Sequence, residues 1–158
     1  MSKYASHSHL PVSSLESHIG FWLRYVSNHV SGQFKLAVEA RGVSVSEWVA
    51  LRHLYECGNC SPAALLAALG MTKGAVSKIV SRLADKGLVS RAASEADGRA
   101  QSIILSAAGR RLVPKLARLA DENDAAFFGH LPAARRRELI ALMQDVVRLH
   151  QLKQVPVE

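Results

Sequence analysis

Apolar residues near the start of the chain recur at steps of three and four positions. They are Leu15, Ile19, Trp22, Val26, Val30, Phe34 and Ala37. This spacing predicts a long amphipathic helix over about 14–39, with Ser13 or Ser14 as its cap and Gly42 after its end. A similar stripe follows Ser106 and is made by Leu112, Leu116, Leu119 and Phe127. After a break at 129–132, a last helix over about 132–151 carries Leu139, Leu142, Met143, Val146 and Leu149.

The middle of the chain predicts three shorter helices. The first runs from about 46 to 55 or 56, capped by Ser44 or Ser46. Ser61 and Pro62 are a typical N-cap and first helical residue, so the second is expected to span about 62–69. Gly70 then turns the chain into the third, which we place at 72–86.

Two short apolar segments follow, at 88–91 and 102–105, and a polar loop that turns at Asp97 and Gly98 joins them. The predicted order is therefore helix, tight turn, helix and β-hairpin, which describes a winged helix-turn-helix. The fold class is mainly α with a small β-hairpin wing (α+β). This order makes binding of double-stranded DNA the leading hypothesis.

Helix 72–86 has one apolar face and one thin, basic face. Val76, Ile79, Val80 and Leu83 fall at core spacing, while Gly74, Ser77, Lys78, Ser81 and Arg82 project the other way. Small residues let a helix enter the major groove, and Lys and Arg donate hydrogen bonds there. We expect Ser77, Lys78 and Arg82 to lie nearest the base edges, and Thr72, Lys73 and Gly74 to contact the phosphate backbone at the helix N-terminus. A merely solvated basic face is the alternative.

The loop of the predicted wing, residues 91–102, supplies a second contact. Arg99 beside Gly98 can enter the minor groove, where the negative potential is strongest when the groove is narrow. Asp97 is expected to pair with Arg99 or another arginine of the loop and to orient it. The alternative is an ordinary solvated turn, because Asp-Gly is a common turn pair.

The charge balance agrees with an anionic partner. The chain of 158 residues carries 20 Lys and Arg against 13 Asp and Glu, a net charge of +7, and the excess is concentrated between Lys73 and Arg111. No apolar run reaches the ~20 residues of a membrane span, and the first residues lack the apolar core of a signal peptide. We therefore expect a cytoplasmic protein without a membrane partner. No phosphate-binding Gly-rich loop, nucleophile elbow or paired-His helix indicates an enzyme or a cofactor.

Four local motifs follow one another in this part of the chain: Leu69-Gly-Met-Thr-Lys-Gly-Ala-Val-Ser-Lys-Ile-Val-Ser-Arg-Leu83, Lys86-Gly-Leu-Val-Ser-Arg91, Asp97-Gly-Arg99 and Leu105-Ser-Ala-Ala-Gly-Arg110. This pattern resembles the multiple antibiotic resistance regulator (MarR) family. The resemblance implies a homodimeric winged-helix transcription factor, usually a repressor, often relieved by a small aromatic or phenolic ligand or by oxidation. Members of this family often have two adjacent arginines where this chain has Gly98-Arg99, so a weaker minor-groove contact is expected.

The resemblance also implies how the chain is divided. A flexible arm is expected at 1–12, a helical dimerisation region at 13–45 and 107–158, and the DNA-binding region at 46–106. Two recognition helices in a homodimer require a pseudopalindromic operator with half-sites about 10 bp apart. A winged-helix module for protein–protein contact is the alternative function.

The regulatory input is less defined. Cys57 and Cys60 are structural, a thiol-based redox pair, or half of a metal site that would need histidines from elsewhere in the fold. We favour the structural role because cytosolic thiols stay reduced. His18, Trp22, Tyr25, His29 and His53 are candidates for a ligand pocket between the dimerisation helices and the DNA-binding region, although Trp22 and Trp48 are expected in the core. His7 and His9 are not expected to be ligands. No cluster of acidic residues and histidines at helical spacing predicts a metal site.

Overall fold

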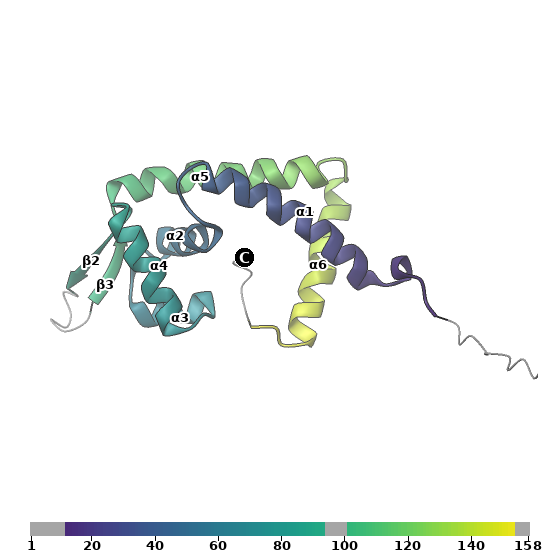
Figure 1. The fold of residues 1–158 in the computed structure, drawn as a ribbon, viewed down its shortest axis with the longest axis horizontal. Helices are drawn as coiled ribbons and strands as arrows, with labels where there is room; N and C mark the ends of the chain where they lie inside the picture. Colours follow the sequence, from purple (N-terminus) through teal and green to yellow (C-terminus); the bar gives the residue numbers. More distant parts are fainter. Residues whose placement is uncertain (1–11, 94–100, 154–158) are drawn as a thin grey trace, which may run out of the picture.

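The computed structural model describes residues 12–93 and 101–153. Within these ranges the chain is mainly helical, with one small antiparallel sheet (Figure 1). The elements in order are η1 (Leu15–Ser17), α1 (Ile19–Glu39), α2 (Val45–Cys57), β1 (Asn59–Cys60), α3 (Pro62–Leu69), α4 (Lys73–Asp85), β2 (Val89–Ala93), β3 (Gln101–Leu105), α5 (Ala107–Phe128) and α6 (Ala133–Leu149). The predicted helices are confirmed to within a few residues at each end, except at the start of the first: α1 begins at Ile19 with His18 before it, a separate 3₁₀ turn (η1) precedes it, and Ser14 makes no side-chain cap.

The two longest helices join the two ends of the molecule. α1 and α5 lie side by side, and the side-chain amide of Asn123 in α5 donates a hydrogen bond of 3.2 Å to the carbonyl of Val30 in α1. Beneath one end of this pair lie α2, α3, α4 and the hairpin, whereas α6 descends from the other end of α5 (Figure 1). The α1–α5 pair thus holds α2, α3, α4 and the hairpin apart from α6.

The helix boundaries follow from local capping chemistry. Ser44 caps α2 in a reciprocal capping box with Glu47, Ser61 caps α3, and Thr72 caps α4 through the backbone N–H of Ala75. Gly70 ends α3 in the left-handed conformation, with φ of 60°. Each of these helix boundaries could be predicted from the sequence because a capping interaction spans only three or four residues.

The sheet contains a strand that the sequence analysis missed. Its order is β1-β3-β2, with Cys60 opposite Ile103 and Val89 opposite Leu105. The sequence analysis placed no strand between the helix that ends near 56 and the one that starts at 62, yet Asn59 and Cys60 form β1. A strand of two residues has no periodicity of its own and forms only because β3, more than forty positions later, offers an open edge.

The hydrophobic core lies in the DNA-reading lobe, which we define as α2 to β3 together with the first half of α5. Leu51, Leu54, Leu65, Leu83 and Leu116 are among its fully buried side chains. α6, by contrast, has no buried residue. No single helix of the described segments is long and apolar enough to span a membrane; α3 and α4 pass that test only as a pair bent by 112°.

One buried ion pair connects α2 with the end of α4. The carboxylate of Glu47 is 2% exposed, and its Oε2 accepts hydrogen bonds of 2.7 Å from Lys86 Nζ and from the backbone N–H of Ser44. A charge this deeply buried requires such partners, since desolvation would otherwise make it unfavourable. The contact fixes the direction of α4 relative to α2.

Candidate nucleic-acid interface

α4 presents the predicted face to the outside. Val76, Ile79, Val80 and Leu83 are buried under the lobe. The residues predicted to bind DNA that lie on or beside α4 are all exposed: Thr72, Lys73, Gly74, Ser77, Lys78, Ser81 and Arg82. A Cβ added at Gly74 would meet nothing within 4 Å, so the chain itself leaves the space above this glycine open.

The charges of this face are not neutralised within the described chain. Lys73, Lys78 and Arg82 form no ion pair with any residue in the described ranges, whereas Lys86, at the end of the same helix, pairs with Glu47. Unpaired cations beside small serine side chains and the bare backbone of Gly74 suit a polyanion that approaches closely. The role of each residue at DNA remains a prediction.

The wing is described only at its base. Asp97 and Arg99 lie outside the described residues, so their predicted pairing and minor-groove contact stay predictions. Gln101 lies at the loop end of the hairpin, opposite Ala93, and Arg91 lies in the middle of β2, opposite Ile103; both side chains are exposed. Arg91 was not among the residues that we predicted to bind, because its strand position does not reveal which side of the sheet it occupies.

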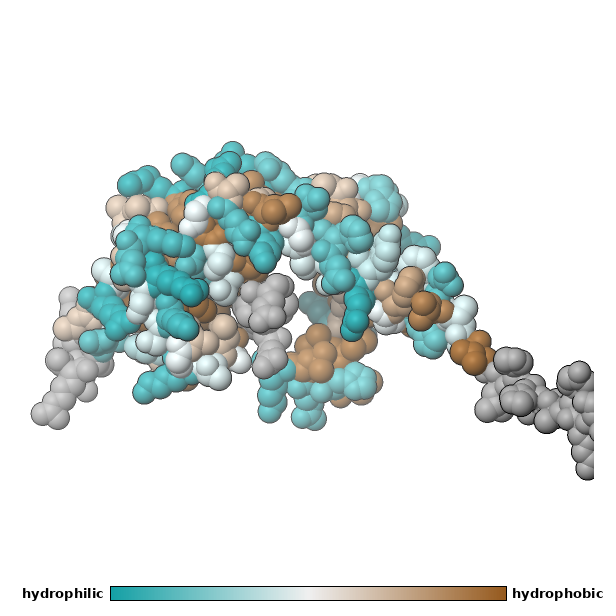
Figure 2. Space-filling view, in the orientation of Figure 1, coloured by the Kyte–Doolittle hydropathy of each residue, from teal (hydrophilic) through white to brown (hydrophobic). Residues whose placement is uncertain are grey.

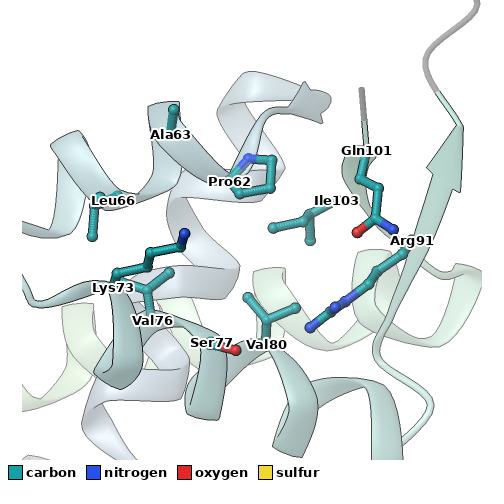
Figure 3. Close-up of a pocket in the computed structure, with 10 residues that line it drawn as sticks. All are labelled: Pro62, Ala63, Leu66, Lys73, Val76, Ser77, Val80, Arg91, Gln101 and Ile103. Carbon is teal, nitrogen blue, oxygen red and sulfur yellow. The ribbon is translucent and has the colours of Figure 1, made fainter. Parts of the chain in front are cut away.

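A cavity of about 480 Å³ opens between α3, α4 and the base of the wing (Figure 3). Its lining is mostly apolar, with Lys73, Ser77, Arg91 and Gln101 as polar members, and Arg91 extends from β2 towards α4 (Figure 3). The full lining is Pro62, Ala63, Leu66, Lys73, Val76, Ser77, Val80, Arg91, Gln101 and Ile103. An apolar floor with two cations suits a flat, anionic molecule.

The five candidate ligand residues fall into two groups. His18 precedes α1, and Trp22, Tyr25 and His29 follow along its first half. The Tyr25 and His29 rings are tilted by 32° with centroids 4.9 Å apart. His53 lies in α2, and among the described residues its ring forms no aromatic pair with any of the other four rings. Trp22 is 50% exposed, so its placement in the core was wrong for the single chain. Trp48 packs edge-on against Phe34 beside the core, as expected.

The two thiols lie in different surroundings. Cys57, the last residue of α2, is exposed, whereas Cys60 in β1 is fully buried. Burial, followed by its contact with Cys57, raises the pKa of Cys60 to about 12, so this thiol stays protonated at neutral pH. Redox sensing requires an accessible thiolate, and the surroundings of Cys60 therefore do not favour it.

Large apolar side chains remain uncovered at the end of the molecule away from the wing. On η1 and α1 they include Leu15, Ile19 and Leu23, and on α6 Ile140, Leu142 and Val146, all at least half exposed. Figure 2 shows this apolar surface gathered over α6 and at the start of the described chain. A row of this size is unusual for a monomer and typical of an interface.

The arrangement of α2, α3, α4 and the β2–β3 hairpin defines the class: this is a winged helix-turn-helix protein. Residues 41–100 match the model of the MarR family. The transcriptional repressor Rv2887 of Mycobacterium tuberculosis is 27% identical over 128 residues, which cover 81% of this chain and 92% of that protein. The chain is thus similar, over its winged helix-turn-helix, to the MarR family of transcriptional regulators, which are DNA-binding proteins and not enzymes.

Solved structures share the whole arrangement. CouR of Rhodococcus jostii, in a structure bound to p-coumaroyl-CoA, is 24% identical with a TM-score of 0.74, covering 85% of this chain and 95% of CouR. BpsR of Bordetella bronchiseptica, whose DNA binding is regulated by 6-hydroxynicotinic acid, is 22% identical with a TM-score of 0.73, covering 86% and 97%. These similarities establish the fold, including the long helices that flank the DNA-reading lobe.

Proposed function

We propose that this chain is a homodimeric, sequence-specific repressor that places α4 in the major groove of a pseudopalindromic operator. The observation that carries the proposal is the exposed face of α4, where Lys78 and Arg82 flank small side chains above a fully buried apolar face. Ser77, Lys78 and Arg82 read base edges in this arrangement. Thr72, Lys73 and Gly74 hold the backbone, Ser81 keeps the helix face thin, and Arg99, oriented by Asp97, enters the minor groove.

Two copies are needed for a two-fold operator, and the uncovered apolar row on η1, α1 and α6 supports this assembly. The described chain offers no other element to cover α6, which has no buried residue. A second copy would cover the same surface on both partners, as two-fold symmetric dimers do. The half-sites would then lie about 10 bp apart.

Selection of binding sites from random duplexes tests the function directly. We expect the purified chain to enrich a pseudopalindrome at low salt. If each copy neutralises about four phosphates, the slope of log affinity against the logarithm of the salt concentration should be about −7. Failure to enrich any sequence at low salt would contradict the proposal.

A pair of matched variants tests the residues. Arg82→Ala should weaken operator binding at least tenfold, since a good contact to a base is worth about 1–3 kcal/mol. Arg118→Ala removes another exposed cation, from α5 and not from the predicted interface, and should leave binding within about twofold. If charge reversal at Arg82 and Arg99 leaves DNA binding unaltered, the chain is instead a winged-helix module for protein contact.

We further propose that a small aromatic or phenolic acid releases the DNA. The support is the cavity between α3, α4 and the wing, which combines an apolar floor with Lys73 and Arg91 directly behind the reading face. The row His18, Trp22, Tyr25 and His29 is the other candidate site, with His53 as a more distant member. 6-Hydroxynicotinate and p-coumarate are suitable probes, because the neighbouring proteins respond to or bind related molecules.

Two substitutions separate these sites. Ala63→Phe fills the cavity from α3 and should abolish release of the operator by the probe, while leaving operator binding in its absence. Trp22→Ala should leave release unchanged. If the probe releases the operator from Ala63→Phe but not from Trp22→Ala, the effector binds on α1. If the probe releases the operator from neither variant, both substitutions touch one larger site.

A further inference from the structure

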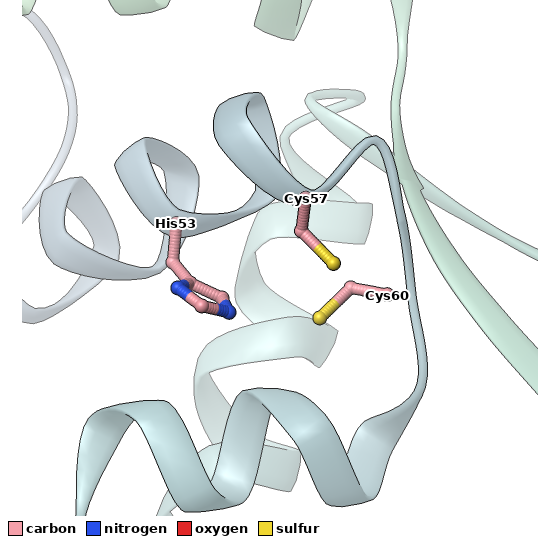
Figure 4. Close-up of side chains that lie close together, drawn as sticks. All are labelled: His53, Cys57 and Cys60. Atoms are coloured by element: carbon pink, nitrogen blue, oxygen red, sulfur yellow. The ribbon is translucent and has the colours of Figure 1, made fainter.

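The end of α2 brings three ligand-type side chains together. The ligand atoms of His53, Cys57 and Cys60 all lie within 4.8 Å of one another, the only such group of three or more His, Cys, Asp or Glu residues among the described ones. His53 and Cys57 are four positions apart and therefore share one face of α2. Gly58, at φ of 74°, then turns the chain so that Cys60 returns to the same place (Figure 4).

The donor set is specific in its chemistry. Thiolates and imidazole are soft or borderline donors, which select Zn²⁺ over the oxygen-preferring Mg²⁺ and Ca²⁺. A Cys₂His set leaves one position of a tetrahedral ion open, as in zinc sites that keep a water ligand. Figure 4 shows the Cys57 and Cys60 side chains close together, with the Cys60 sulfur directed towards the His53 ring, which extends from the preceding turn of α2.

We propose that His53, Cys57 and Cys60 bind one Zn²⁺ ion in each chain, with the fourth position facing solvent beside the exposed Cys57. Binding replaces the two thiol protons, which pass to solvent, and uses the lone pair of the neutral imidazole; no electron is transferred. Binding of the ion requires a buried and an exposed thiol close together. The buried Cys60 anchors the ion to the sheet, and the exposed Cys57 leaves a path by which the ion can enter.

The location gives the ion a structural consequence. Cys60 pairs with Ile103 in β3, and Ser61, the next residue, caps α3. An ion held here ties the end of α2 to the central strand of the wing and to the start of the helix-turn-helix. The three residues lie in α2 and β1 and are not among those proposed to contact DNA, so this proposal does not depend on DNA binding.

Cobalt is the probe that tests the site. The full-length protein is stripped of metal, its thiols are kept reduced with a phosphine, and Co²⁺ is added. We expect one equivalent per chain to produce thiolate-to-cobalt charge-transfer absorption and the strong visible bands of four-coordinate Co²⁺, both removed by one equivalent of Zn²⁺. With Zn²⁺ at a hundredfold excess over its dissociation constant, the Tm should rise by about 5 °C.

Variants assign the ligands. Cys57→Ser changes an exposed residue, so it should fold normally and lose most of the charge-transfer band. His53→Gln should retain thiolate absorption but weaken binding more than about tenfold. His130→Gln, which alters an exposed histidine between α5 and α6, should bind cobalt as the parent chain does.

Two results would overturn the site. The first is a folded, fully reduced protein that shows no charge-transfer band with Co²⁺. The second is unchanged cobalt affinity in both Cys57→Ser and His53→Gln. A reduced chain that takes up no cobalt but closes a Cys57–Cys60 disulfide in air would assign the two thiols to redox chemistry instead.

Discussion

The two ends of this molecule differ in how their apolar side chains are covered. The DNA-reading lobe closes a core within one chain, with Leu51, Leu65 and Leu83 fully buried and Glu47 paired. α6 and the start of α1 carry apolar rows of similar length and bury almost none of them. Helical periodicity alone does not distinguish the two cases, because it indicates which face is apolar and not what covers that face.

This difference separates the two tasks. A reading helix must be held in one direction by its own chain, since a base contact depends on the position of a few atoms. In the proposed homodimer, the terminal helices present their apolar face to the second copy, which then sets the distance between the two reading helices. Substitutions at one end should therefore alter folding stability, and those at the other end should alter assembly.

The largest expected effect is at α6. Val146→Asp places a carboxylate in the apolar row, and a two-fold dimer would bury two of them, so we expect the dimer to weaken by more than about 4 kcal/mol. Sedimentation equilibrium measures the effect. Gln144→Asp adds the same charge on the polar side of α6 and should leave assembly unchanged. Equal masses for parent and Val146→Asp would place the interface elsewhere.

A second change tests how tightly the lobe is closed. A Cβ at Gly109 would overlap the backbone carbonyl oxygen of Leu88, where α5 begins against the sheet. Because a backbone atom cannot rotate away, Gly109→Ala should lower the free energy of unfolding by about 3 kcal/mol in denaturant titrations. Gly32→Ala in α1, where the added Cβ meets nothing within 4 Å, should raise it by about 0.5–1 kcal/mol. Similar free energies of unfolding for the two variants would show that the backbone at Leu88 moves to accommodate the added Cβ.

The smallest effect concerns the ion pair that orients α4. Glu47→Gln removes the carboxylate that holds Lys86, and because Lys86 is 39% exposed and can be resolvated, we expect a loss of about 2 kcal/mol. The matched control is Glu56→Gln, which breaks the surface pair with Arg52 and should cost at most about 0.5 kcal/mol. Chemical denaturation measures both, and a loss for Glu47→Gln no larger than for Glu56→Gln would remove the ion pair as a support of α4.

Most of the fold could be predicted because its signals are local. The caps at Ser44, Ser61 and Thr72 and the stop at Gly70 act over three or four residues, and the buried face of α4 follows from spacing. The exposed position of Lys78 and Arg82 follows in the same way. Predicting that Trp22 is in the core failed because a stripe does not reveal whether the chain itself supplies the cover.

The sequence by itself determined the order of helices, turns and hairpin, the thin basic face of α4 and the resemblance to the MarR family, since each depends on neighbouring residues. The tertiary structure decided what depends on distant segments: β1 pairing with β3, Lys86 reaching Glu47, the cavity under Arg91, and His53 meeting Cys57 and Cys60. The physical reason is that spacing along the chain fixes which face a side chain occupies, whereas only packing fixes which other segment it meets.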